Sequence, residues 1–275
     1  VKRVEDTFTQ IHEYLRAFSG KTDLLKNGRI KLGDYVDLPS SFAVVAYGGK
    51  GVIAANSLPA GSDKLRLIVV GINSFNAQGS YKGSGSMETG GPDPAIPHIV
   101  LHFKDTPVDR RMEVTSTNVN GYLGSEMRKY LVDYNSSGGN FSVGLKNAGV
   151  PLDEDIIWAP KRYVANGGNG ATDADLIEDK IWLPTVWEIF DCQGPSVAAY
   201  ETETNQARLE YYDSPEKRWK SSGFNNYYWM GSPASGPIGM GYMIFCYANP
   251  NNSDTGLNGG GAEYDMGVAP AFCVR

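Results

Sequence analysis

The chain has 275 residues, the length of one large domain or two small ones, and 41% of them are hydrophobic, enough for a buried core. The net charge is −6 and no Lys/Arg-rich run is present, which argues against nucleic acid as a partner because phosphate backbones repel an acidic protein. No apolar run approaches the roughly 18 residues of a membrane span, so membrane insertion is not expected.

Residues 1–24 are predicted to be an N-terminal segment with an amphipathic helix of about four turns, because apolar side chains recur there at steps of three and four. These side chains are Val4, Phe8, Ile11, Leu15 and Phe18. Gly20 is expected to end the helix. The apolar stripe either packs on the rest of the protein or pairs with copies of itself, as a stalk or linker that would make the protein a homo-oligomer.

Residues 25–275 are predicted to form a single domain that begins with strands. We expect strands at 34–39, 65–70 and 96–103, and the second of these is apolar enough to lie inside a sheet. The segment 76–97 is rich in Gly, Ser and Pro and is typical of a long surface loop.

Helices are predicted in the middle of the chain. Ser125 is expected to cap a helix over 125–133, a second helix covers 141–148, and Pro184 is expected in the first turn of a third over 184–190. The predicted core consists of Leu67, Val69, Met127, Leu131, Trp182, Leu183, Trp187, Phe190, Trp229, Phe245 and Phe272.

The last part of the chain has an unusual composition. Between residues 221 and 262 the only charged residue is Asp254, whereas Tyr, Asn, Ser and Gly are abundant. Strands are expected at 227–230, 242–247 and 268–274. Such a composition is typical of antibody-type binding surfaces, and the alternative is a buried core with Gly/Asn turns.

Candidate metal and catalytic residues are few. His98 and His102 fall on one face of a predicted strand, where they either share a metal or line a half-exposed face. An acidic group is interpreted as a solvated loop because it lacks calcium-loop spacing. It comprises Asp173, Asp175, Glu178 and Asp179. Cys192, Cys246 and Cys273 are either buried free thiols or one disulfide and a free thiol. No catalytic residue, metal site or cofactor is therefore expected.

Five segments in chain order carry a resemblance to a known family. They are GYLGSEMR at 121–128, WLPTVWE at 182–188, YWMGSP at 228–233, FC at 245–246 and GVAPAFCV at 267–274. Together they resemble an uncharacterised domain family of gut and oral bacteria and their phages. That family is similar to the C-type-lectin-like fold of the formylglycine-generating enzymes, and the resemblance spans roughly residues 28–275.

The resemblance implies an α+β fold of the C-type-lectin-like kind, with two helices flanking a small, mostly antiparallel sheet behind the N-terminal helix. Some proteins with this fold are variable proteins of diversity-generating retroelements, in which mutagenesis at adenines rewrites codons near the C-terminus. A variable, ligand-binding region at about 221–265 is then implied. Its candidate ligand-binding residues are Asn225, Asn226, Tyr228, Tyr247, Asn249, Asn251, Asn252, Ser253 and Asp254.

Two departures limit what the resemblance implies. The copper-holding cysteine pair of the formylglycine-generating enzymes is not matched, since Cys246 and Cys273 are far apart in the sequence, and the Trp-Asn-Asp calcium motif of sugar-binding lectins is absent. We therefore expect a non-enzymatic display protein that binds a protein or glycan on a cell surface. It would be a phage receptor-binding or decoration protein, or a bacterial surface protein, located on the virion or the cell surface. The alternatives are an oxidase or other enzyme on the same fold, and a purely structural virion domain.

Overall fold

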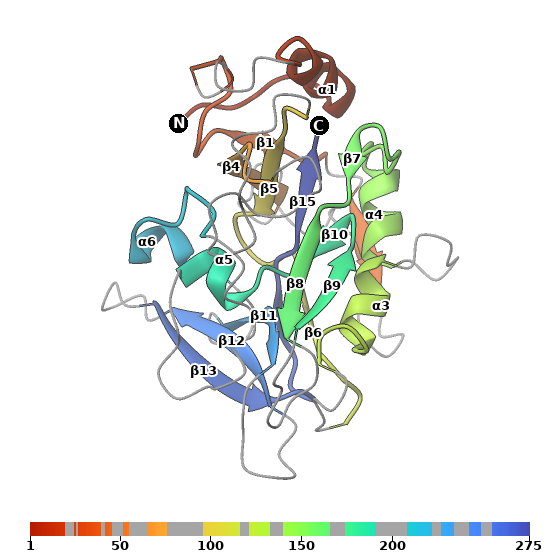
Figure 1. Cartoon of the computed structure of the whole chain (residues 1–275). Coiled ribbons are helices and arrows are strands. Elements are labelled where there is room, and N and C mark those ends of the chain that lie inside the picture. Colours follow the sequence, from red (N-terminus) through yellow and green to blue (C-terminus); the bar gives the residue numbers. More distant parts are fainter. Residues whose placement is uncertain are drawn as a thin grey trace.

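The computed structural model of the chain contains two large β-sheets with helices at their sides (Figure 1). It is a mixed α+β protein in which most strand pairs are antiparallel. The residues that the structure describes are 1–19, 25, 27–39, 42–45, 52–54, 65–75, 96–115, 121–132, 140–165, 174–190, 208–221, 227–233, 242–248 and 255–275.

The first sheet has six strands and is antiparallel throughout. Its order is β1-β4-β5-β15-β10, and β7 also pairs with β15. The strands are β1 (Tyr35–Asp37), β4 (Arg66–Ile72), β5 (Ile99–Phe103), β7 (Ile157–Trp158), β10 (Ile181–Trp182) and β15 (Ala271–Val274). The three strands predicted in the first part of the chain are confirmed, and β4 lies inside the sheet as expected. Every residue of β5 is buried, so the alternative of a half-exposed face is wrong.

The second sheet has five strands in the order β13-β12-β11-β14-β6, and only its β11–β14 pair is parallel. The strands are β6 (Val108–Arg110), β11 (Tyr227–Pro233), β12 (Tyr242–Ala248), β13 (Thr255–Gly261) and β14 (Met266–Val268). Two further pairs are formed by β2 (Ala43–Val45) with β3 (Val52–Ala54) and by β8 (Lys161–Ala165) with β9 (Ala174–Glu178). The strands expected at 227–230 and 242–247 are thereby confirmed.

The strand expected over 268–274 is divided between the two sheets, and this corrects the prediction. β14 ends at Val268 and pairs with β6 and β11, whereas β15 begins at Ala271 and pairs with β5. Pro270 lies between them and has no N–H for a ladder hydrogen bond. The carbonyl of Ala269 instead accepts a hydrogen bond from His102 Nε2 at 2.7 Å.

The helices in the middle of the chain largely match the predictions. They are α3 (Glu126–Val132), α4 (Phe141–Asn147), α5 (Val186–Phe190) and α6 (Pro215–Arg218), of which α6 was not predicted. Ser125 Oγ caps α3 by accepting from Arg128 N at 3.0 Å. Pro184 is not in the first turn of α5, because the helix begins only after Thr185. The Glu188 side chain accepts a hydrogen bond from Thr185 N at 2.5 Å at this helix start. Within the described residues, no helix is both long and apolar enough to cross a membrane.

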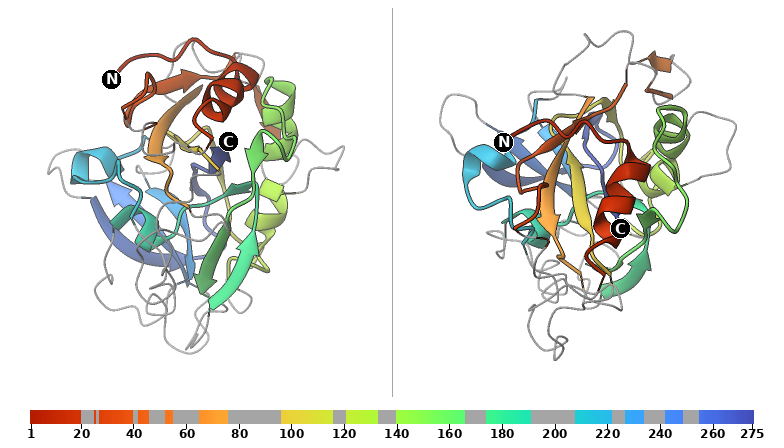
Figure 2. Two further views of the ribbon diagram at one scale, coloured as in Figure 1. Left: turned by 45° about the horizontal axis from the view of Figure 1, so that its top comes forward. Right: turned by 90° about the horizontal axis from the view of Figure 1, so that it is seen from above.

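The N-terminal helix packs on the rest of the protein. α1 (Phe8–Arg16) starts later than Val4. The Val4 N–H donates to the carbonyl of Tyr35 of β1, and Thr7 forms the capping box of α1 with Gln10. α1 lies over one end of the six-stranded sheet, next to the C-terminus (Figure 2). Its buried face touches β15, with ring centroids of Phe8 and Phe272 6.0 Å apart. The apolar stripe is therefore occupied by the protein's own core, and the alternative of a self-pairing stalk loses its basis. Gly20 lies outside the described residues.

Most of the predicted core is confirmed. The buried members are Leu67, Val69, Met127, Leu131, Trp182, Leu183, Phe190, Trp229 and Phe272. Trp187 is only half-buried, and the side chain of Phe245 lies outside the described part. The two predicted helices do not flank one sheet: α3 contacts β10 of the six-stranded sheet, and α5 contacts β11 of the five-stranded sheet, on opposite sides of the molecule (Figure 1).

Candidate functional site

The register of the five-stranded sheet relates the candidate ligand-binding segments to each other. Tyr227 at the start of β11 pairs with Tyr247 near the end of β12, and Ala248 at the end of β12 pairs with Thr255 at the start of β13. These residues define one end of the sheet, which we call the loop end. Most candidates are joined to the sheet here and lie outside the described residues: Asn225, Asn226, Asn249, Asn251, Asn252, Ser253 and Asp254.

Tyr228 does not have the exposed side chain that we expected. It is 1% exposed, and its hydroxyl donates to the carbonyl of Arg218 at 2.8 Å. Its two following neighbours, Trp229 and Met230, are also buried, so both faces of β11 are covered here. The sequence signal was the unbroken apolar run, which is typical of a strand buried on both faces. Of Tyr247, the structure describes only the backbone pairing with Tyr227.

The strand beneath the loop end is fixed to the neighbouring elements by hydrogen bonds. Trp229 Nε1 donates to the carbonyl of Arg110 at 2.8 Å, and Ser232 Oγ accepts from Val186 N at 3.0 Å. Gly231 N donates to the carbonyl of Pro184 at 2.9 Å, and a Cβ at Gly231 would lie 2.7 Å from the carbonyl oxygen of Leu183. β11 is therefore a rigid support.

The two histidines of the predicted metal pair have structural roles. His98 accepts from Phe75 N at Nε2 (3.1 Å) and donates from Nδ1 to the carbonyl of Ile96 (2.9 Å). His102 contacts the Tyr212 hydroxyl through Nδ1 and donates from Nε2 to Ala269. Both nitrogens of each ring are engaged, so neither ring offers a lone pair to a metal. Burial, aided by the charge of Lys220, lowers the pKa of His102 well below 6.5.

The acidic group is not a solvated loop as a whole. Asp179 is buried and accepts two hydrogen bonds from Arg128, at 2.8 Å from Nε and 2.7 Å from Nη2. Glu178 is exposed at the end of β9 and lies 3.6 Å from Lys161 Nζ. Asp173 and the side chain of Asp175 lie outside the described residues. In the described part of the chain, no three His, Cys, Asp or Glu side chains gather closely enough to hold a metal.

The structure contains a buried ion pair that was not predicted from the sequence. Arg162 on β8 and Glu188 on α5 are both fully buried and joined by two hydrogen bonds, at 2.8 and 2.7 Å. Arg162 also donates to the carbonyl of Leu183, and its guanidinium lies 4.8 Å from the ring centroid of Trp182. Each charge compensates the other. Replacing only one of the two side chains would leave a buried, unpaired charge and should lower the free energy of unfolding by about 3–5 kcal/mol. The pair fixes β8 to the helix beside β11.

Cys273 lies in the middle of the six-stranded sheet as a free, buried thiol. Burial raises its pKa well above the usual value, so the thiol is protonated and unreactive at neutral pH. Cys192 and the side chain of Cys246 lie outside the described residues.

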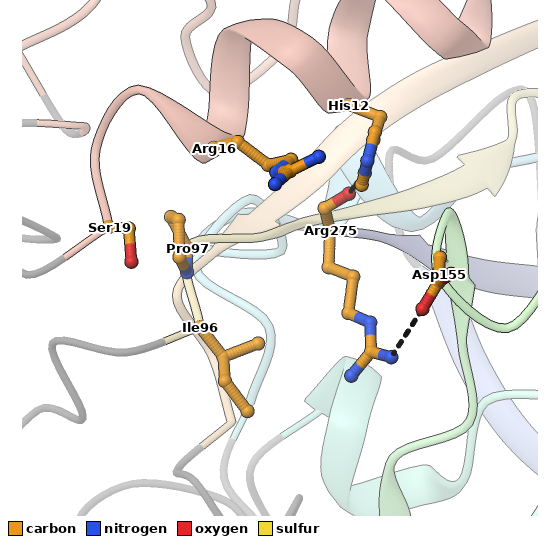
Figure 3. Close-up of a pocket in the computed structure, with 7 residues that line it drawn as sticks. All are labelled: His12, Arg16, Ser19, Ile96, Pro97, Asp155 and Arg275. Carbon is orange, nitrogen blue, oxygen red and sulfur yellow. Dashed lines mark hydrogen bonds and ion pairs between the residues drawn. The ribbon is translucent and has the colours of Figure 1, made fainter.

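A pocket of about 500 Å³ lies between α1 and the C-terminus (Figure 3). Its described lining residues are His12, Arg16, Ser19, Ile96, Pro97, Asp155 and Arg275. The pocket could not be predicted from the sequence, because these residues come from four distant parts of the chain. Figure 3 shows the Arg16 side chain extending from α1 toward His12, whereas the Arg275 side chain extends away from Arg16 to its ion pair with Asp155.

The chain was compared with protein-family models, with curated proteins and with solved structures. None of the three comparisons gave a match.

Proposed function

We propose that this protein is a non-enzymatic ligand-binding protein that recognises a protein or glycan on a cell surface through the loop end of its five-stranded sheet. The observation that carries the proposal is the register. Tyr227, Ala248 and Thr255 lie at the same end, so the segments holding the candidate residues all begin or end there. Binding residues are often found on segments joined to a rigid scaffold.

The chemistry of the candidate segments supports recognition. The stretch 249–254 is Asn-Pro-Asn-Asn-Ser-Asp, rich in side chains that both donate and accept hydrogen bonds. Asn225 and Asn226 add the same chemistry directly before β11. Tyr228 is left out of the proposed surface because it is buried. Adaptable polar side chains on a hydrogen-bonded base suit a surface that changes its ligand without losing its fold.

The element order supports the more specific proposal of a C-type-lectin-like fold. The last strand, β15, lies between β5 and β10, and the helices α3 and α4 precede the strands that form the loop end. On that basis the protein is a phage receptor-binding or decoration protein, or a bacterial surface protein, displayed on the virion or cell surface. The loop end would be the segment diversified by a retroelement.

Binding to a glycan array and to immobilised envelope proteins of bacterial cells tests the proposal. We expect the variant N249A/N251A/N252A to lose the binding that the wild-type chain shows, with a melting temperature close to that of the wild type, because exposed substitutions shift stability by only about 0.5 kcal/mol. The matched control is N27A/N147A, which removes exposed amides elsewhere and should bind as the wild type does.

Two outcomes would refute the proposal. One is unchanged binding by the triple variant. The other is a melting temperature lowered by several degrees for each Asn change, since the loop end would then be part of the packing. The retroelement part has its own test: a reverse-transcriptase gene beside this one, with a repeat of the last coding segment.

A further inference from the structure

The segment 208–221, which we call the bridging segment, contacts both large sheets and leads into the loop end. It contains α6, which lies at the outer side of the molecule next to α5 and contacts β13 (Figure 1). Its last residue, Ser221, is separated from Tyr227 at the start of β11 by five residues. Asn225 and Asn226 are among these five, so the bridging segment holds one end of a link that carries candidate ligand-binding residues.

The bridging segment is attached to the six-stranded sheet largely by hydrogen bonds. Tyr211 N donates to the carbonyl of Val70 in β4 at 3.0 Å, and Ser221 N donates to Asp105 Oδ1 at 2.7 Å. None of the residues of α6 is buried. A segment with few buried apolar side chains opens at a lower free energy than the core of the same protein.

His102 of β5 is fully buried beneath the bridging segment. The Tyr212 ring lies with its centroid 5.8 Å from that of the imidazole, and its hydroxyl contacts Nδ1. Lys220 is also buried and donates from Nζ to the backbone carbonyl that follows His102 on β5. The partners of His102 across β4 and β15 are Ile68 and Ala271, which carry no charge. Among the described residues, the titratable side chains placed against His102 are thus Tyr212 and Lys220, both from the bridging segment.

The closed bridging segment keeps His102 neutral. Burial and the charge of Lys220 both lower the pKa of His102 well below 6.5. Because Nε2 donates to Ala269, Nδ1 accepts from the Tyr212 hydroxyl, which only the neutral ring can do. Opening of the segment takes Tyr212 and Lys220 away and admits water, so the ring regains its ordinary pKa of about 6.5. Below that pH the open form binds a proton that the closed form does not bind, and the equilibrium shifts toward the open form.

We propose that the bridging segment opens locally with uptake of one proton by His102, and that this opening releases the loop end in mild acid. The effect on the loop end rests on the proposed binding function: the link with Asn225 and Asn226 loses its anchor, and a bound ligand dissociates as the pH falls. The opening itself needs no ligand and is measured separately. A protein whose bridging segment opens in acid but which binds no cell-surface ligand would refute the binding function alone.

Hydrogen–deuterium exchange of the full chain, corrected for the intrinsic exchange rate at each pH, tests this inference. We expect the opening constant of residues 208–221 to rise about tenfold between pH 7.5 and 5.5, because one proton binds to a group with a pKa of about 6.5. The amides of β4 should remain the more protected at each pH. His102→Gln, which can still donate and accept hydrogen bonds, should abolish the rise. The matched control is His12→Gln, which removes a histidine from α1 and should keep it.

Tyr212→Phe is a second test that does not depend on replacing His102. It keeps the ring over the imidazole and deletes the hydroxyl, so the opening constant at pH 7.5 should rise about fivefold, as expected for one lost buried hydrogen bond. The inference is overturned if the opening constant of 208–221 does not change with pH, or if β4 opens equally often, since the whole protein would then be unfolding. It is also overturned if His102→Gln keeps the rise or if Tyr212→Phe opens like the wild type.

Discussion

Several ionisable side chains of this protein are buried, and each contacts a partner far away in the sequence. Arg162 and Glu188 are 26 residues apart, and Arg128 and Asp179 are 51 apart. His102 contacts Tyr212 and Ala269, which are 110 and 167 positions away. In each case a buried polar group is hydrogen-bonded to another part of the chain, so these contacts fix how the elements meet.

We predict that His102 makes the stability of the fold sensitive to mild acid. The pKa of His102 in the folded protein lies below 6.5. On acidification the imidazole is therefore protonated in the unfolded chain at a pH where it stays neutral in the folded protein. The free energy of unfolding should therefore fall as the pH drops below about 6.5, and this loss should continue down to the folded pKa. In His102→Gln, which can still donate and accept hydrogen bonds, the slope between about pH 6.5 and 5 should flatten.

Urea denaturation of both proteins at several pH values measures this slope. Equal slopes would show that His102 is not the group responsible.

The identity of single site residues was the hardest feature to predict. Composition drew attention to the whole stretch 221–262, and it is the register of β11, β12 and β13 that relates its Asn-rich segments to one end of a sheet. Tyr228 was assigned to the surface because composition does not say which face of a strand is covered. The pocket that Arg16 and Arg275 line could not be predicted, since nothing in a linear sequence shows that two distant arginines lie in one pocket.

Periodicity predicted the helices and strands well where the apolar pattern was strong. The helices around 126–132 and 141–147 and the strands in the first part of the chain are confirmed. The errors have local causes: the Val4 N–H donates to β1 and Val4 lies outside the helix, and Pro270 divides the last strand. β13 was not predicted, because its sequence Thr-Gly-Leu-Asn-Gly-Gly-Gly has no strand-like apolar pattern.

The docking of α1 leads to a prediction about stability. Ile11 is completely buried against the sheet, so Ile11→Ala should lower the free energy of unfolding by about 2–5 kcal/mol. Glu13→Ala, an exposed change in the same helix, should alter it by less than about 0.5 kcal/mol.

Chemical denaturation measures both values, and sedimentation checks the mass. If Ile11→Ala left the free energy of unfolding unchanged and sedimented with a lower mass than the wild type, α1 would instead pair with copies of itself as a stalk.

The two large sheets are joined through the last part of the chain. β14 belongs to the five-stranded sheet and β15 to the six-stranded sheet, with only Ala269 and Pro270 between them. β15 pairs with β5, β7 and β10, so it holds three segments together. Loss of this strand would open both the sheet and the surface on which α1 packs.

Cys273 on β15 should report on unfolding of the whole molecule. Because the thiol is fully buried and its pKa is raised, a thiol reagent should modify it only when the sheet opens. In a C192S/C246S background, labelling of Cys273 should be slow in native buffer and should accelerate in Ile11→Ala in proportion to the lost stability. Rapid labelling of the native protein would contradict the central position of β15.

The position of β15 also has a consequence for biosynthesis. β5 is translated early, whereas the strand that covers one of its edges emerges from the ribosome only after more than half of the sequence has followed. Until then this apolar strand has an open edge, the kind of surface on which nascent chains aggregate. Folding should therefore be slow, because the open edge of β5 is closed only when β15 is available, and a chain that lacks β15 should depend on chaperones to stay in solution.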